Sequence, residues 1–178
     1  MVAGPSGVGK GTVIAELQKR HPDTWLSVSA TTRAPREGEV DGVSYFFYDR
    51  DRFEELVRGG EMLEWDAHFG HLYGTPRQPV EQHLAAGHDV ILEIDVEGAR
   101  QVQASAPEAL LVFIAPPSRE ELVRRLRARG TEDSAELEIR IARAEEELAA
   151  QTEFDRVIIN HDVGQAVAEL VKLTESPS

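Results

Sequence analysis

The chain has 178 residues, 41% of them hydrophobic, and no cysteine. A chain of this length forms one domain with a sizeable core, and the lack of cysteine excludes disulfides, thiolate metal sites and a cysteine nucleophile. The net charge of −13 argues against general nucleic-acid binding, because such proteins carry a basic surface. No apolar run reaches the ~18 residues of a membrane span, and only three residues precede the first glycine-rich motif. We therefore expect a cytoplasmic protein with no signal peptide and no membrane association.

A glycine-rich loop opens the chain, with the sequence Gly4-Pro5-Ser6-Gly7-Val8-Gly9-Lys10-Gly11-Thr12. The apolar residues 1–3 predict a strand before it, and the run 13–20 predicts a helix after it. Strand, loop, lysine and helix together are typical of a P-loop, in which backbone N–H groups and the helix N-terminus surround a phosphate. Lys10 would then reach the outer phosphates of a nucleotide. The weaker alternative is a glycine-rich turn that only caps a helix.

The loop departs from the usual pattern at Gly11, where a Ser or Thr normally binds Mg²⁺. Thr12 is the next hydroxyl in the chain. We therefore expect the metal-binding role to pass to Thr12 or to water.

Residues 30–78 look like a small, mainly β insertion. Strands are expected at 25–29 and 43–48, and a loop between them at 30–39, where proline and glycine interrupt any periodicity. A short helix is expected at 51–58 with Asp51 as its N-cap, followed by strands at 62–69 and 72–73.

From residue 79 onward, helices alternate with strands. The pattern predicts helices at 79–86, 97–104, 119–129, 134–150 and 164–173, and strands at 89–95, 110–115 and 157–160. Ser118 is expected to cap the helix at 119–129. Such alternation indicates an α/β fold with a parallel sheet, whose ligands bind beyond the carboxyl ends of the strands. The P-loop, Glu93, Asp95 and Asn160 all follow strands and are expected at that edge.

Seven of the nineteen basic residues lie between Arg119 and Arg143. The spacings of Glu120 to Arg124, Glu121 to Arg125 and Glu136 to Arg140 are i,i+4, which would support any surface helix. Spacing alone therefore favours a structural interpretation of this cluster. The histidines at 68, 71 and 83 show no spacing that indicates a metal site.

The sequence strongly resembles the guanylate kinase family, which makes GDP from GMP and ATP, over nearly its whole length. The likeness rests on the P-loop 4–10 and on Ser-Ala-Thr-Thr-Arg-Ala-Pro-Arg-Glu-Gly-Glu at 29–39, Asp-Gly-Val-Ser-Tyr at 41–45, Leu-Glu-Trp at 63–65, Tyr-Gly-Thr at 73–75, Leu-Glu-Ile-Asp at 92–95 and Arg-Gly-Thr-Glu at 129–132.

The resemblance implies a single-domain P-loop NTPase fold of three layers with a five-stranded parallel core sheet. The core would comprise 1–28, 79–118 and 145–178, the GMP-binding insertion 29–78, and a helical lid 119–144. The family's first strand is usually longer than the residues before Gly4, and we expect an upstream extension to raise the melting temperature.

The resemblance also implies roles for single residues. ATP would be bound by Gly4, Pro5, Ser6, Gly7, Val8, Gly9, Lys10, Gly11, Thr12, Arg125, Arg129 and Asn160, and GMP by Ser29, Arg33, Arg36, Tyr45, Glu64, Tyr73, Thr75 and Asp95. Mg²⁺ would be held through Thr12 and, by way of a water, Glu93. The catalytic residues would be Lys10, Arg33, Arg125, Arg129 and Arg140, whereas Arg119, Arg124 and Arg127 keep the structural interpretation.

The chemistry of these side chains suits their implied roles. Arg33 and Arg36 can form two-point contacts with a phosphate, to which Tyr45 and Tyr73 can donate hydroxyls. Glu64 can accept from N1–H and the 2-amine of guanine, whereas adenine has an acceptor at N1 and no 2-amine. The alternatives are core packing for the tyrosines, a solvated loop for the arginines and an ordinary strand position for Glu64.

We therefore expect an enzyme of purine nucleotide metabolism that uses ATP and GMP with Mg²⁺ and needs no protein partner. One alternative is an inactive guanylate-kinase-like domain that binds phosphopeptides, although the intact Gly9-Lys10 argues against it. Another is a kinase for AMP or UMP, which Glu64 argues against. A P-loop GTPase lacks support, because no Asn-Lys-x-Asp run is present.

Overall fold

The computed structural model describes residues 1–68, 70–128 and 134–174. The chain forms two compact units, each with its own sheet and core. Unit 1 comprises Met1–Asp23, Glu93–Val96 and Leu110–Ser178, and unit 2 comprises Thr24–Leu92 and Glu97–Ala109.

Unit 1 is built on a parallel sheet with the strand order β1-β8-β9. The strands are β1 (Val2–Ala3), β8 (Val112–Ala115) and β9 (Arg156–Ile159). Every residue of β8 is buried, as expected for an apolar strand that is covered on both faces. An isolated parallel bridge joins Val2 to Glu93, so the chain after β7 also reaches β1.

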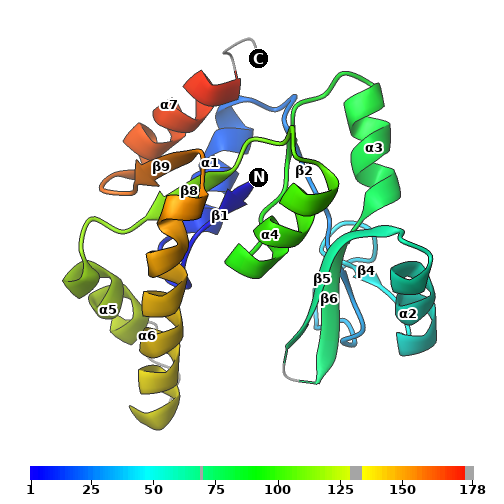
Figure 1. The fold of residues 1–178 in the computed structure, drawn as a ribbon, viewed down its shortest axis with the longest axis horizontal. Helices are drawn as coiled ribbons and strands as arrows, with labels where there is room; N and C mark the ends of the chain where they lie inside the picture. The colour runs from blue at the N-terminus through cyan, green and yellow to red at the C-terminus, as the bar shows by residue number, and fades with distance from the viewer. Residues whose placement is uncertain (69, 129–133, 175–178) are drawn as a thin grey trace. The chain divides into compact units, whose positions relative to one another are not determined.

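Four α-helices accompany this sheet in the described part of unit 1: α1 (Lys10–Arg20), α5 (Arg119–Ala128), α6 (Ser134–Ala149) and α7 (Val163–Thr174). A 3-10 turn, η1 (Ala150–Glu153), follows α6. Helix α1 packs against α7, and α5 packs against α6 (Figure 1). The interface of α5 and α6 is apolar and consists of Leu122, Leu126, Ile141 and Ala144. The Ser118 hydroxyl accepts from the Glu121 N–H at 3.2 Å, which confirms the predicted cap of α5.

Unit 2 contains a four-stranded sheet with the order β4-β3-β6-β5. Its strands are β3 (Ala30–Thr31), β4 (Phe46–Phe47), β5 (Met62–His68) and β6 (His71–Pro76). A separate parallel pair joins β2 (Trp25–Leu26) to β7 (Val90–Ile91). The core beneath the larger sheet consists of Ala30, Phe53, Leu56, Met62 and Leu72.

The helices of unit 2 are α2 (Arg50–Arg58), α3 (Arg77–Ala85) and most of α4 (Val96–Ser105). The prediction that Asp51 caps α2 was wrong. The cap is Asp49, whose carboxylate accepts from the Arg52 N–H at 2.8 Å, while Asp51 lies in the first turn. Either aspartate suits the pattern, because acidic side chains are favourable both at the cap and in the first turn.

The predicted loop at 30–39 was also partly wrong, because Ala30 and Thr31 form strand β3. This strand pairs with β4 on one side and with β6, more than 40 residues away, on the other. A strand of only two residues is too short to show the alternation of apolar and polar residues that predicts a strand, so its pairing could not be predicted from the sequence.

The mixed α/β fold with parallel strands is confirmed. Parallel pairing occurs in the three-stranded sheet of unit 1, in the pair β2-β7 of unit 2 and between β3 and β4. One continuous five-stranded sheet, a helical lid and the predicted segment boundaries stay predictions. Within the described ranges, no helix has the length and apolar character needed to cross a bilayer.

Candidate active site

The glycine-rich loop joins β1 to α1 in unit 1. Gly4, Gly7 and Gly9 have φ angles of 146°, 83° and 93°, which L side chains rarely adopt. Helix α1 begins directly at Lys10, and no described side chain caps its N-terminus. The first N–H groups of α1 and the positive end of its dipole are thus available to an anion.

Gly4 lies so close to β8 that no larger residue fits. A Cβ atom there would lie 2.2 Å from the Ile114 carbonyl oxygen. We expect Gly4→Ala to lower the free energy of unfolding by about 2 kcal/mol or more, since strain and a backbone clash combine. Urea unfolding measures this. Gly87→Ala is the matched control, because Gly87 also has a positive φ but open space around it, and a loss of equal size there would contradict the clash.

Lys10 is folded back across its own loop. Its Nζ donates to the Gly4 carbonyl oxygen at 2.5 Å, and Gly4 stands at the start of the loop. The ammonium group therefore lies beside the first residue of the loop, and its contact with the phosphates of a nucleotide stays a prediction.

Arg125 and Asn160 both contact the loop at Val8. The Asn160 side chain is only 4% exposed, and its amide donates to the Val8 carbonyl oxygen at 2.8 Å. Arg125 donates to the same oxygen at 3.1 Å and to the Asn160 carbonyl oxygen at 3.2 Å. Asn160 therefore supports the loop, and its contact with adenine stays a prediction.

Glu121 orients the guanidinium of Arg125. Its Oε1 accepts from Arg125 Nε at 2.7 Å and from Arg124 Nη2 at 2.6 Å, so the predicted pairing of Glu120 with Arg124 is replaced by an i,i+3 pair. Hydrogen bonds from Arg124 and Arg125 lower the pKa of Glu121 to about 2.

The lowered pKa of Glu121 predicts a pH-dependent contribution to stability. A carboxyl whose folded pKa is depressed stabilises the fold above its unfolded pKa, about 4.5, and loses that contribution as the pH falls toward 2. The melting temperatures of the wild type and Glu121→Gln should differ by a constant amount above pH 5 and converge as the pH falls from 4.5 toward 2. A difference that grows with acidity would contradict this.

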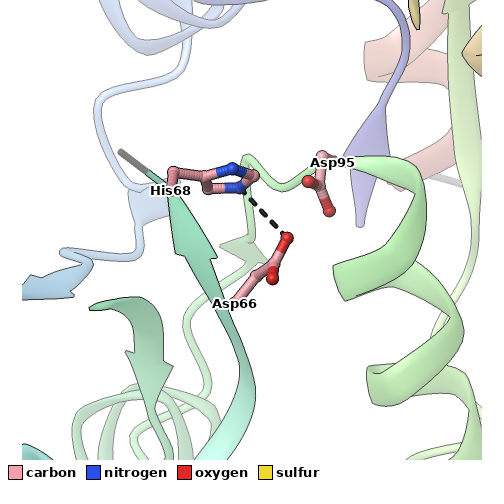
Figure 2. A group of neighbouring side chains, drawn as sticks. All are labelled: Asp66, His68 and Asp95. Atoms are coloured by element: carbon pink, nitrogen blue, oxygen red, sulfur yellow. Dashed lines mark ion pairs between the residues drawn. The ribbon is translucent and has the colours of Figure 1, made fainter. Parts of the chain in front are cut away.

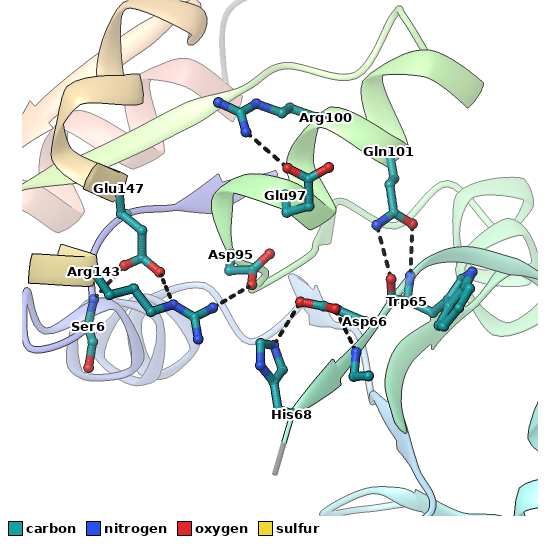
Figure 3. A network of polar contacts seen from close by, with 12 residues as sticks. Ser6, Trp65, Asp66, His68, Asp95, Glu97, Arg100, Gln101, Arg143 and Glu147 are labelled. Carbon is teal, nitrogen blue, oxygen red and sulfur yellow. Dashed lines mark hydrogen bonds and ion pairs between the residues drawn. The ribbon is translucent and has the colours of Figure 1, made fainter. Parts of the chain in front are cut away.

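Arg140 and Glu147 of α6 contact the loop at Ser6. Arg140 Nη2 donates to the Ser6 hydroxyl at 3.1 Å, and the Ser6 N–H donates to Glu147 Oε2 at 3.2 Å. Arg143 lies between Glu147 and Asp95 and contacts both carboxylates (Figure 3).

Glu93 lies beside the start of α1. A Cβ atom built on Gly11 would be 3.7 Å from Glu93 Oε1. Burial raises the pKa of Glu93, and the nearby Lys10 charge partly offsets this. The carboxylate is thus held next to the position where a P-loop usually has its metal-binding hydroxyl.

A groove of about 600 Å³ opens next to the loop. Its lining consists of Gly11, Thr12, Ala15, Glu16, Lys19, Arg20, Val163 and Gly164. The groove runs along α1 from Gly11 to Arg20, beside the start of α7.

In unit 2, Arg33 forms a bidentate ion pair with Glu39. The two guanidinium nitrogens lie 2.8 and 3.0 Å from the carboxylate oxygens, and Glu39 also accepts from the Arg36 N–H at 2.7 Å. The hydrogen bond to Glu39 raises the pKa of Arg33, and the pair lowers the pKa of Glu39. Glu39 therefore fixes the backbone of the loop at Arg36 and the orientation of the Arg33 guanidinium. Glu39 lies in the family motif at 29–39, but the motif implies no role for it.

Two tyrosines surround Arg33. Its Cζ lies 5.5 Å from the centre of the Tyr45 ring, and the Tyr45 and Tyr73 rings meet edge-on at 6.2 Å. A hydrogen bond to Tyr73 also contributes to the raised pKa of Arg33. Arg36 is exposed on the same loop, and Ser29 lies next to β4 through the hydrogen bond from the Phe46 N–H to its carbonyl oxygen. Arg33, Tyr45 and Tyr73 thus lie together, with Arg36 exposed on the same loop, and their contact with a phosphate stays a prediction.

Glu64 and Thr75 form a buried pair across β5 and β6. The Thr75 hydroxyl donates to Glu64 Oε1 at 2.5 Å, and Glu64 is only 9% exposed. Farther along β5, Gln101 of α4 exchanges two hydrogen bonds with the Trp65 backbone (Figure 3), and Asp66 pairs with His68 at 3.2 Å (Figure 2). The strand is thus fixed along its length, and it presents Glu64 from a rigid position.

The predicted residues fall into two groups. Unit 1 holds Gly4–Thr12, Glu93, Asp95, Arg125, Arg140 and Asn160, and unit 2 holds Ser29, Arg33, Arg36, Tyr45, Glu64, Tyr73 and Thr75. Arg129 lies outside the described residues. Arg119 pairs with Glu145 and Arg124 with Glu121, which fits their structural interpretation. Glu147 was missed, because an i,i+4 helix pair carries no sign of its contact with the loop.

Comparison with known proteins gives a family match over nearly the whole chain. The family model described as guanylate kinase matches residues 1–176. Guanylate kinase from Synechococcus sp. (strain CC9311) is 58% identical over 172 residues, which are 97% of this chain and 90% of that protein. The one from Thermobifida fusca (strain YX) is 54% identical over 178 residues, which are 100% of this chain and 91% of the relative.

Solved structures agree with this match. The crystal structure of guanylate kinase from Anaplasma phagocytophilum superposes with a TM-score of 0.75 at 32% identity, covering 97% of this chain and 81% of that one. Shikimate kinase from Bacteroides thetaiotaomicron matches with a TM-score of 0.52 at 18% identity, covering 98% and 96% of the two chains, which is a likeness of fold alone.

Proposed function

Because the chain belongs to the guanylate kinase family, we propose that it transfers the terminal phosphoryl group of ATP to GMP, giving ADP and GDP. The observation that carries the choice of acceptor is the buried carboxylate of Glu64, held by Thr75 at 2.5 Å. A fixed carboxylate acceptor suits a base with two adjacent donors, and guanine is such a base.

Unit 1 would bind the donor nucleotide. The loop glycines and the start of α1 offer N–H groups to the phosphates, and Lys10 supplies a positive charge. The groove begins at Gly11 and Thr12, where the loop ends, and its volume of about 600 Å³ has room for the nucleoside end of ATP. Arg125, Arg140 and Arg129 would neutralise the charge on the moving phosphoryl group.

Unit 2 would bind the acceptor nucleotide. Arg33, Arg36, Tyr45 and Tyr73 would hold the GMP phosphate, and Ser29, Glu64 and Thr75 would read the guanine. Glu39 already occupies Arg33 with a carboxylate, which is a planar anion of similar geometry to part of a phosphate. The phosphate of GMP would therefore bind to an Arg33 guanidinium whose orientation is already fixed by Glu39. Asp95, which the family resemblance assigns to GMP, lies in unit 1.

Thr12 and Glu93 fit Mg²⁺, which prefers oxygen ligands and retains several waters. The Glu93 carboxylate faces the start of α1, where Gly11 supplies no hydroxyl, so Glu93 and Thr12 would hold the ion mainly through water. When bound, Mg²⁺ neutralises charge on the ATP phosphates.

The direct test is product formation from ATP and Mg²⁺ with GMP, AMP and UMP in parallel. We expect turnover with GMP and turnover lower by ~10⁴ with AMP, because a buried acceptor left unpaired discriminates strongly. Equal turnover with AMP would overturn the role of Glu64. No turnover with any nucleotide would overturn the proposed activity.

A further inference from the structure

Helix α6 carries a carboxylate that binds the main chain of the phosphate loop. Glu147 Oε2 accepts from the Ser6 N–H at 3.2 Å, and its side chain is only 15% exposed. The other oxygen, Oε1, accepts from Arg143 Nε at 3.1 Å (Figure 3). Both oxygens of Glu147 are therefore used, one by the loop and one by its own helix.

Arg143 extends this contact to a third element. Its Nη2 lies 3.5 Å from Asp95 Oδ2, and Asp95 stands directly before α4. One continuous set of polar contacts thus runs from Ser6 through Glu147 and Arg143 to Asp95, all within unit 1 (Figure 3). We call these four residues the Glu147 bridge.

The contacts of the Glu147 bridge go beyond those of an ordinary surface pair. An exposed i,i+4 ion pair is worth about 0.3–0.5 kcal/mol and fixes nothing outside its helix. Glu147 is instead largely buried and accepts a charge-assisted hydrogen bond from backbone, which is roughly twice as strong as a neutral one. The peptide plane before Ser6 is thereby fixed.

Fixing Ser6 also fixes the side chain that Arg140 contacts. Arg140 donates to the Ser6 hydroxyl at 3.1 Å, so α6 contacts both the side chain and the backbone N–H of Ser6. Phosphoryl transfer depends on placing donors within a fraction of an ångström, and a shift of ~1 Å can cost ~10²-fold in rate.

We propose that Glu147 is a positioning residue for phosphoryl transfer, which holds the phosphate loop at Ser6 and, through Arg143, holds the carboxylate of Asp95. This rests on the proposed function. The Glu147 bridge has two arms: the contact of Glu147 with Ser6 (the Ser6 arm) and its contact through Arg143 with Asp95 (the Asp95 arm). The Ser6 arm orders the residues that would bind ATP, and the Asp95 arm orders a carboxylate that would bind GMP.

Three variants separate the two arms, and a control and the rescue variant Arg143→Lys accompany them. Glu147→Ala removes both, Glu147→Gln keeps an oxygen for the Ser6 N–H but loses the charge that Arg143 needs, and Arg143→Ala removes the Asp95 arm alone. Glu146→Ala is the matched control, because Glu146 is an exposed carboxylate one residue away on the same helix. For each variant we would measure kcat, both KM values, the melting temperature and the Kd of a non-hydrolysable ATP analogue.

We expect Glu147→Ala to lower kcat by about 10- to 100-fold and to raise the Kd of the ATP analogue. Glu147→Gln and Arg143→Ala should raise the KM for GMP several-fold and leave the Kd of the ATP analogue within about twofold of the wild type, and Arg143→Lys should partly restore the KM. Glu146→Ala should match the wild type throughout.

A lowered melting temperature of Glu147→Ala with unchanged kcat, KM and Kd would overturn the proposal, since that is the signature of a purely structural pair. If Glu147→Ala does not fold, an unchanged KM for GMP in both Glu147→Gln and Arg143→Ala overturns it instead. Failure of the proposed function can be told apart from failure of this proposal, because the wild type would then not convert GMP. The Kd of the ATP analogue would still report on the Ser6 arm in that case.

Discussion

Replacing Lys10 by methionine is expected to lower kcat/KM for GMP phosphorylation by about 10²–10³-fold, the usual loss when one donor to developing charge is removed. Methionine keeps most of the length of the side chain and removes the charge that now contacts the Gly4 carbonyl oxygen. The loss should appear in kcat more than in the KM for ATP, because the lysine is needed most when charge moves onto the outer phosphates. Steady-state kinetics at saturating GMP measures both.

Lys172→Met is the control for this experiment. Lys172 is an exposed lysine in the last turn of α7, and the chain has only three lysines. The control should keep wild-type kinetics. If Lys10→Met did the same, the loop would not act as a catalytic phosphate site, whatever its geometry.

Glu64→Gln is expected to lower kcat/KM for GMP by about 10²–10⁴-fold and to leave the slow background with AMP unchanged or raised. The glutamine amide places an N–H where guanine also has donors, so the two donors face each other in a site that is 9% exposed. Thr75→Val should show a smaller loss of the same selectivity, because it removes the hydroxyl that fixes Glu64.

The control for base recognition is Glu61→Gln, which changes an exposed carboxylate just before β5. It should not alter the ratio of GMP to AMP turnover. An equal loss with both nucleotides in Glu64→Gln would mean that Glu64 supports the fold of the sheet and does not read the base.

The sequence by itself determined the local features of this protein. Glycines, a lysine and flanking apolar runs predict the loop between β1 and α1, since the required backbone angles and helix start are properties of adjacent residues. The apolar run of β8 and the cap at Ser118 are local in the same sense, and both are confirmed. Family motifs add Arg33, Glu64 and Tyr73 as predicted site residues.

Only the tertiary structure decided which side chains hold those residues in place. The pairing of β3 with β6, the bidentate hold of Glu39 on Arg33, the contact of Asn160 with Val8 and the Glu147 bridge join residues that are far apart in the chain or sit in ordinary helix and loop patterns. Helical or strand periodicity reports which face of an element is apolar, but a polar contact depends on distance and direction between elements. For that reason the sequence predicts which residues meet the nucleotides, whereas packing determines which side chains hold those residues in place.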